Sequence, residues 1–488
     1  MNSSETASAA AGSASDSSGI GGHPRGLTTL FFTEMWERFS YYGMRALLIL
    51  FMVAPESDGG LGFSTALAGT VYGIYTASVY LASLPGGWVA DRFLGLRNAV
   101  FVGGIVIAAG HFSMAVPGLA FFYSGLAMIV IGTGLLKPNI SAMVGELYSA
   151  DDARRDGGYS IYYMGINIGA FASPLVCGTL GQTVGWHWGF ASAGVGMVFG
   201  LIQYKLTAKY LGRAGLKRQR AEQEEKTPPL AQAMWLGGLG VIVAALFLDL
   251  PEVQKFILMA LGSTSFIASL YVGAGHSPEV RRRGFAIYLM FWASAVFWSG
   301  FEQAGSSLNL FADRMTRLEV FGWAFPSSWF QSLNPLYIFC LAPVFSVLWV
   351  KLGRRNPSSP GKFSFGLLFA GAGFLLLAIA AMGAGGSRVS PMWLVSVYLL
   401  HTIGELCLSP VGLSVMSKLA PPKIVGQIMG VWFLSTAIGQ YMAGVAASMF
   451  EELPLDELFG WVAALSIGMG LLLAALVKPI RKLMEGVH

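Results

Sequence analysis

Seven ionisable side chains fall within stretches of sequence that are otherwise apolar enough to cross a membrane. A charge placed alone at the centre of a membrane-spanning helix costs about 3 kcal/mol, so these side chains must pair with one another or line a water-filled path. Four are acids and three are bases, which leaves one carboxylate without a permanent basic partner and therefore suited to carry a proton. We interpret the set as a site that moves a proton or a charged solute across a membrane. Its members are Glu34, Glu37, Arg38, Arg45, Lys137, Glu302 and Glu405.

Four of these charges lie in one segment, between residues 34 and 45. At ~100° per residue, Glu34, Glu37, Arg38, Tyr41 and Arg45 share a helix face roughly 100° wide. The i, i+3, i+4 spacing of the first three leaves open the alternative that they only hold helices together. Arg45 and the charges beyond this segment are flanked by small or aromatic residues, which favours a role in lining a cavity.

Polar and aromatic residues accompany the charges. Asn167 and Asn334 lie within apolar spans, where an amide predicts hydrogen bonding to a ligand or, alternatively, contact between helices. His401 precedes Glu405 by four residues and is interpreted as a packed histidine, although it is close enough to modulate the acid. Aromatic residues in membrane proteins often form belts at the interface, so those beside the charged motifs are candidates only. They are Tyr41, Tyr42, Tyr80, Trp298 and Trp432.

The composition excludes a soluble protein. Hydrophobic residues make up 54% of the 488-residue chain, charged residues only 12%, and 63 residues are glycine. Such a composition is typical of an all-α polytopic membrane protein. Apolar runs of about 18 to 28 residues predict fourteen transmembrane helices. The predicted spans are 28–54, 66–91, 97–115, 119–145, 157–181, 187–211, 231–249, 253–273, 284–312, 327–351, 363–383, 391–419, 424–449 and 457–478.

The basic residues predict the orientation. Most of the 31 Lys and Arg residues fall in tails and loops on one side of the predicted spans, and few fall on the other: Lys255, Arg314, Arg317 and Arg388. Because basic residues stay in the cytoplasm, this bias places both termini there. The net charge of +5 arises from these loops and gives no reason to expect nucleic-acid binding.

The predicted domains follow from the breaks in hydropathy. Residues 1–26 form a Ser/Ala/Gly-rich tail that is expected to be disordered and lacks the features of a signal peptide. A six-helix bundle at 27–212 precedes a charged linker and two-helix hairpin at 213–283, a second six-helix bundle at 284–480, and a cytoplasmic tail at 481–488. The loop sequence GGWVADRFLGLR from Gly86 returns weakly as LWVKLGRRNP from Leu348, as in a repeat. It resembles the inter-helix loop signature of the major facilitator superfamily.

Longer motifs resemble one family of that superfamily. The segment from Glu34 to Arg45, EMWERFSYYGMR, is similar to the first-helix signature of the proton-dependent oligopeptide transporters. The stretches GGWVADR, LKPNIS, YSIYYMGINIGAF, FEQAGSSLNLFA, FQSLNP and GELCLSPVGLS also resemble that family and occur in its order. The resemblance runs from about residue 27 to 480. The additional hairpin is similar to that of prokaryotic members, which have fourteen spans.

The resemblance implies a proton-coupled symporter that imports di- and tripeptides by alternating access. It assigns proton coupling to Glu34, Glu37, Arg38 and Glu302. It places Arg45 and Lys137 at the peptide carboxylate, Glu405 at the peptide amine, and Asn167 and Asn334 at the peptide backbone or termini. It assigns the side-chain pockets to Tyr41, Tyr42, Tyr80, Trp298 and Trp432. Animal members carry a histidine in the second span where this chain has Gly73.

Other interpretations remain. The same fold carries nitrate or other anions in plant relatives, although the charge of Glu405 would repel an anion. A peptide sensor without transport is a further alternative. No nucleophile or metal-ligand motif predicts an enzyme, and the three cysteines, Cys177, Cys340 and Cys407, are too scattered for a metal site. We therefore expect no cofactor other than the coupling proton, and we expect di- and tripeptides, protons and the lipid bilayer as partners. The expected state is a monomer in the bacterial inner membrane.

Overall fold

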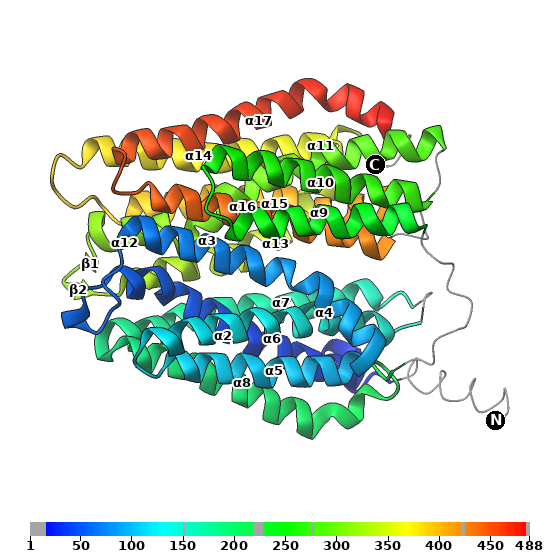
Figure 1. Cartoon of the computed structure of the whole chain (residues 1–488), viewed down its shortest axis with the longest axis horizontal. Coiled ribbons are helices and arrows are strands. Elements are labelled where there is room, and N and C mark those ends of the chain that lie inside the picture. The colour runs from blue at the N-terminus through cyan, green and yellow to red at the C-terminus, as the bar shows by residue number, and fades with distance from the viewer. Residues whose placement is uncertain (1–15, 150–151, 218–227, 275–276, 421–424, 485–488) are drawn as a thin grey trace. The chain divides into compact units, whose positions relative to one another are not determined.

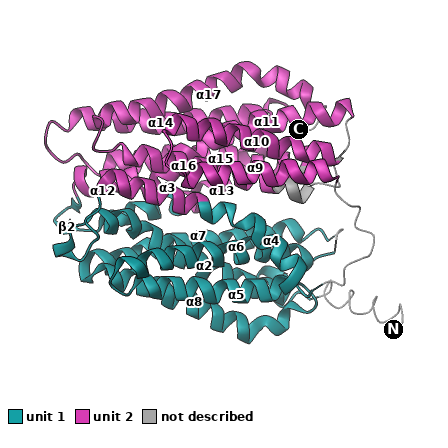
Figure 2. Ribbon diagram, viewed as in Figure 1, with its two compact units in different colours: residues 1–63, 78–220, 318–336 teal, residues 64–77, 221–317, 337–488 magenta. Residues whose placement is uncertain are grey.

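The computed structural model describes residues 16–149, 152–217, 228–274, 277–420 and 425–484. Helices dominate it (Figure 1), and the fourteen predicted spans are confirmed. Eleven helices are long and apolar enough to cross a membrane by themselves. The chain divides into two compact units, residues 1–63, 78–220 and 318–336, and residues 64–77, 221–317 and 337–488 (Figure 2).

The first unit is built mainly from helices of the N-terminal half of the chain. Glycines with positive φ angles begin two of them, Gly95 at +76° and Gly118 at +124°, because an L side chain rarely adopts that conformation. Buried aliphatic side chains from several helices form its core, among them Leu30, Ile107 and Leu136. The helices are α2 (Arg25–Val53), the end of α3 (Thr65–Leu81), α4 (Ser83–Val89), α5 (Leu96–Met114), α6 (Leu119–Glu146), α7 (Arg155–Ser173) and α8 (Trp186–Thr207).

The second unit contains the hairpin and the C-terminal helices. Ser277 caps α11 by accepting a hydrogen bond from the backbone N–H of Val280, and Pro278 occupies the first turn, as expected at a helix start. The helices are α9 (Pro229–Phe247), α10 (Glu252–Ala274), α11 (Pro278–Phe301), α12 (Ser307–Met315), α13 (Leu333–Leu352), α14 (Ser359–Gly383), α15 (Met392–Leu419), α16 (Val425–Ser448) and α17 (Leu455–Leu483).

The two units differ from the predicted bundles in two segments. Residues 64–77 belong to the second unit, because Gly73 on α3 packs closely against Gly444 on α16. Residues 318–336 belong to the first unit. There, strands β1 (Glu319–Val320) and β2 (Trp323–Ala324) form a small antiparallel pair. The Ser332 hydroxyl donates to the Phe171 carbonyl at 2.8 Å, which ties this segment to α7.

The predicted helix at 284–312 is interrupted. After α11 ends at Phe301, residues Glu302–Gly305 form a 3-10 turn, and α12 begins at Ser307. Ser306 has φ −126° and ψ −99°, which is not a helical conformation. Glu302 therefore lies at a break between two helices rather than in the middle of one.

The hairpin carries an ion pair in the first turn of α10. Lys255 was expected in a loop, but it lies in α10 and is only 7% exposed. Its ammonium lies 3.2 Å from the Glu252 carboxylate, one turn earlier. The Tyr441 hydroxyl of α16 donates to the second oxygen of Glu252 at 2.9 Å.

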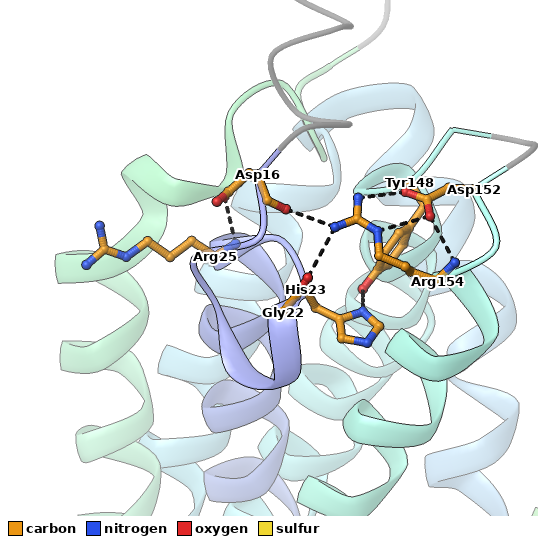
Figure 3. Close-up of polar contacts among 7 residues, drawn as sticks. All are labelled: Asp16, Gly22, His23, Arg25, Tyr148, Asp152 and Arg154. Atoms are coloured by element: carbon orange, nitrogen blue, oxygen red, sulfur yellow. Dashed lines mark hydrogen bonds and ion pairs between the residues drawn. The ribbon is translucent and has the colours of Figure 1, made fainter.

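The tail predicted at residues 1–26 is ordered from Asp16 onward, which corrects that prediction. The Asp16 carboxylate accepts a hydrogen bond from the Arg25 backbone at 2.8 Å. The Arg154 guanidinium donates to the Asp16 and Gly22 carbonyls, each at 3.2 Å, and pairs with Asp152 at 2.9 Å (Figure 3). Polar contacts thus order a segment whose composition offers little apolar surface to bury. Residues 1–15, which were predicted to be disordered, lie outside the described residues. So do residues 485–488, which are most of the predicted C-terminal tail.

Candidate functional site

The charged face of α2 is buried as a compact cluster. Glu34, Glu37 and Arg38 are 2%, 0% and 3% exposed. The Arg38 Nε lies 3.1 Å from a Glu34 oxygen and also pairs with the Glu37 carboxylate. These pairs join residues of one helix, so they do not by themselves connect helices. Removing one partner of a buried pair leaves an uncompensated charge, and the cluster is therefore sensitive to protonation and substitution.

A tyrosine that the sequence did not single out links this cluster to α7. The Tyr162 side chain of α7 interacts electrostatically with Glu34, and its hydroxyl lies 3.4 Å from the Ser141 hydroxyl of α6. Glu34 thus has a helix-connecting contact as well as its pairing with Arg38. The interpretation that the acids hold helices together applies to this contact. It does not account for Glu37, which forms its ion pair within α2.

Tyrosine rings lie against Arg38 and Arg45 of α2. The Arg38 guanidinium lies 5.4 Å from the centre of the Tyr41 ring and 6.0 Å from that of Tyr42. The Arg45 guanidinium lies 5.7 Å from the Tyr42 ring. A cation over an aromatic face is stabilised by the ring quadrupole. Tyr41 and Tyr42 therefore hold the two guanidinium groups along one side of the helix.

Lys137 belongs to the same cluster, although it comes from α6. Its ammonium lies 3.8 Å from the centre of the Tyr80 ring, at the end of α3, and it interacts electrostatically with Glu37. Pro138 follows Lys137 inside an unbroken helix. The Gly134 carbonyl, four residues before that proline, faces α4 so closely that a Cβ at Gly86 would collide with it. The structure thus brings α2, the end of α3 and α6 together near Glu37.

The two asparagines lie in the first unit but make different contacts. Asn167 is 5% exposed and donates to the Tyr163 carbonyl one turn earlier in α7, at 2.9 Å. Asn334 is half-buried in the first turn of α13. The hydrogen bond of Asn167 uses one of the two protons of its amide group, so a donor and the carbonyl oxygen remain for other contacts. The roles assigned to these residues stay predictions.

The second unit buries two acids on separate elements. Glu302, at the break after α11, is 4% exposed, and Glu405, on α15, is 8% exposed. Beside Glu302, the Ser307 hydroxyl donates to the Gln303 side chain at 2.5 Å and the Gln303 amide donates to the Ser299 carbonyl at 3.0 Å. These contacts order the break. The assignment of Glu302 to proton coupling and of Glu405 to a substrate amine stays a prediction.

Two tryptophans of this unit serve in packing. Trp298 is 8% exposed and lies against Gly439 of α16, where an added Cβ would approach it to 2.6 Å. Trp432 is 4% exposed and lies against Gly412 of α15. The Trp432 ring fills the space that Gly412 leaves open, whereas at Gly439 the close neighbour is the Cβ of Trp298. His401 packs 4.9 Å from the Phe374 ring, in agreement with the expectation of a packed histidine.

The described residues contain no group of three or more His, Cys, Asp or Glu side chains arranged to hold a metal ion. Their ionisable groups can instead exchange protons or contact a charged solute directly. Cations gather in the first unit, where Arg38, Arg45 and Lys137 lie near the acids of α2. The second unit contributes the carboxylates of Glu302 and Glu405.

Comparison with known proteins decides the family. The sequence model of the POT family matches residues 97–462. The chain belongs to the POT family. Among its relatives, an uncharacterized transporter YclF of Bacillus subtilis is 42% identical, with 96% of each chain covered. The peptide transporter YePEPT of Yersinia enterocolitica is 41% identical, again with 96% of each chain covered.

Solved structures of POT family members share the fold along the whole chain. A crystal structure of a mutant peptide transporter POT in complex with alafosfalin is 43% identical, with a TM-score of 0.85. The match covers 98% of this chain and 99% of that one. The predicted family and the major facilitator fold are thereby confirmed. With its membrane-spanning helices and bacterial POT relatives, the chain is a multi-pass protein of the bacterial inner membrane.

Proposed function

We propose that this POT family member imports di- and tripeptides together with protons by alternating access. The observation that carries the proposal is the buried cluster on α2, in which Arg38 pairs with both Glu34 and Glu37. When one of two acids that share a guanidinium is protonated, the other still pairs with that guanidinium. The cluster can therefore gain or lose a proton without leaving a buried arginine unpaired, as proton coupling requires. The names of the relatives support the cargo: YePEPT is a peptide transporter, and one from Lactococcus lactis is a di-/tripeptide transporter.

The chemistry of the two units suits a zwitterionic peptide. Arg45 and Lys137 offer cations for the carboxylate, and Glu405 offers a carboxylate for the amine. A peptide that uses both sets couples its own binding to the conformational change of alternating access. Glu302 accepts or releases the coupled proton, with no other cofactor and no enzymatic step. The proposal includes a monomer with both termini in the cytoplasm, as the distribution of Lys and Arg predicts.

Uptake by reconstituted protein tests the proposal. The full-length chain in liposomes is given labelled dialanine with an inward proton gradient, with and without a protonophore. A potential of ~100 mV contributes about 2.3 kcal/mol per proton, so accumulation of up to about fifty-fold is expected, and the protonophore should abolish it. Downhill flux without accumulation would contradict proton coupling. Binding without flux would support a peptide sensor instead.

Two variants separate coupling from recognition. Glu302→Gln should lose uphill accumulation but keep exchange of peptide between the two sides, because exchange requires no net proton movement. Glu319→Gln, which changes an exposed acid of β1, is the matched control and should behave like the parent protein. A Glu302→Gln protein with full uphill uptake would refute the role of Glu302. Uptake of nitrate in place of dialanine would favour the anion alternative.

A further inference from the structure

A cavity lies at the end of the first unit where α6 stops and α7 begins. Its volume is about 1190 Å³, and its lining on α6 begins at Ala142, about 7.5 Å along the helix beyond Lys137, and extends away from Lys137 to Glu146. It is therefore separate from the ionisable cluster. Its charged and hydroxyl-bearing lining consists of Glu146, Tyr148, Arg155, Tyr159, Arg213 and Lys217.

The lining carries more positive than negative charge. Arg155, Arg213 and Lys217 are three cations against the one carboxylate of Glu146, and that carboxylate already accepts the Gly215 backbone N–H at 2.7 Å. In the described part of the chain, none of the three cations forms an ion pair. Three cations around one cavity repel one another unless an anion joins them. The electrostatics therefore favour a bound anion.

The geometry of the cavity leaves space for that anion and donors around it. A Cβ at Gly145 would lie 2.8 Å from the Tyr159 hydroxyl and 3.3 Å from an Arg155 nitrogen, so the absence of a side chain there keeps these two groups accessible. Tyr148 is held by His23, whose Nδ1 lies 2.8 Å from its hydroxyl. Guanidinium groups and tyrosine hydroxyls are the donors that phosphate oxygens accept most readily.

Exposed apolar side chains lie beside the polar lining of the cavity. Leu216, in its lining, is 51% exposed. The Lys217 ammonium donates to the carbonyl of Phe93 at 3.3 Å, and the Phe93 ring is 58% exposed and packs on Trp88. A free phosphate ion gains nothing from exposed apolar side chains, whereas the acyl chains of a lipid do.

We propose that this cavity binds the phosphate of an anionic phospholipid headgroup, with Arg155 and Arg213 as its principal contacts. Basic pockets between membrane helices on the cytoplasmic side are suited to such headgroups. The shared chemistry is a phosphate group, which inorganic phosphate also carries. The exposed apolar residues beside the cavity assign it to the lipid.

Binding of a short-chain lipid tests the proposal. The full-length protein in a neutral detergent is titrated with dioctanoyl phosphatidylglycerol, and binding is followed by native mass spectrometry and by the shift in unfolding temperature. The same titration with dioctanoyl phosphatidylcholine and with inorganic phosphate provides the other two arms. We expect phosphatidylglycerol to bind at least tenfold more tightly than either of the others.

Variants locate the binding. The double substitution Arg155→Gln with Arg213→Gln should weaken phosphatidylglycerol binding about 30-fold, since each basic group near an anionic headgroup contributes on the order of fivefold. Gly145→Leu should weaken it by filling the cavity while every charge is kept. The matched control, Arg354→Gln with Arg355→Gln, removes two exposed arginines of another loop predicted to lie on the same side and should change the affinity less than twofold.

Three results would overturn the proposal. One is equal affinity for phosphatidylglycerol in the parent protein and the Arg155/Arg213 double variant. Another is an equal loss of phosphatidylglycerol affinity in the Arg354/Arg355 control, which would mean that lipid binding depends only on the overall charge of the protein. The third is binding of inorganic phosphate without binding of phosphatidylglycerol, which would assign the cavity to a free anion. If the double variant fails to fold, the affinity of Gly145→Leu for phosphatidylglycerol tests the proposal, and an affinity equal to that of the parent protein would overturn it.

Discussion

The ammonium of Lys137 lies 3.8 Å from the centre of the Tyr80 ring, so a cation assigned to peptide binding is supported by an aromatic face from α3. A desolvated cation–π contact contributes about 2 kcal/mol. The ring holds the ammonium in place, and any substrate carboxylate that approaches Lys137 meets a cation that is already positioned.

Tyr80→Leu should therefore raise the KM for dialanine by roughly 5- to 30-fold, because about 1 to 2 kcal/mol of cation–π stabilisation is lost. Tyr80→Phe keeps the ring and should change KM less than threefold. Initial rates of uptake in proteoliposomes measure both. If Tyr80→Phe and Tyr80→Leu raised KM equally, the hydroxyl of Tyr80 rather than its ring would be the important group.

Arg38 neutralises two buried carboxylates, and its removal should destabilise the protein. Arg38→Gln leaves Glu34 and Glu37 without their shared cation, at a cost of about 3 to 5 kcal/mol. A lowered unfolding temperature in detergent measures this loss. Adding Glu37→Gln should restore part of the stability without restoring uphill uptake. If the double variant were no more stable than the single one, the pairing with Glu37 would not be the cause.

Gly73 stands where animal members of the family carry histidine, and the structure gives a reason for glycine in this chain. A Cβ at Gly73 would approach the Gly444 Cα to 2.9 Å and the Tyr441 carbonyl to 3.1 Å. Gly73→Ala should destabilise the protein by about 1 to 3 kcal/mol through overpacking. Gly87→Ala is the control, since nothing lies within 4 Å of a Cβ there. Unfolding temperatures that fall equally would argue against the close contact of α3 with α16.

The ordered N-terminal segment should loosen at low pH. Hydrogen bonds from Arg154 hold the pKa of Asp152 below its usual value of 3.8, and those from Ser18 and Arg25 do the same for Asp16. A carboxylate with a lowered pKa stabilises the folded state above the pH at which the unfolded group titrates. That contribution disappears as the pH falls through the lower, folded value.

Hydrogen exchange of a peptide that spans residues 16–27 measures this loosening after correction for the intrinsic rate. Protection should be constant from neutral pH down to about 4 and fall below it. Arg154→Gln should reduce protection already at neutral pH, because it removes the donors to Asp16, Gly22 and Asp152. Arg355→Gln is the exposed control. Equal protection in the Arg154 variant and the parent protein would contradict a role for this network.

The sequence predicted the face of α2 well, because helical spacing alone places Glu34, Glu37 and Arg38 together. It also predicted the number of spans, since apolar length is a local property. Local sequence patterns could not predict the role of Tyr162, because that role depends on how closely α7 approaches Glu34. A tyrosine in a run of tyrosines carries no signal of which one faces the acid.

The break at Glu302 and the place of Lys255 show a second limit. Glycines near Glu302 fit either close packing or a helix break, and only the non-helical angles of Ser306 decide between them. Lys255 was assigned to a loop because a lysine is costly inside a membrane. Its cost is offset by Glu252 nearby and by a hydroxyl from a helix far along the chain, which hydropathy cannot register.

The bond between Tyr441 and Glu252 joins residues 189 positions apart, and this has a consequence for biosynthesis. At ~5 to 20 residues per second, the ribosome makes Tyr441 roughly 10 to 40 seconds after Glu252. During that interval the nascent hairpin has only its own Lys255 to neutralise the acid. The ion pair between Glu252 and Lys255 therefore neutralises both charges of the hairpin until α16 is synthesised and packs against it.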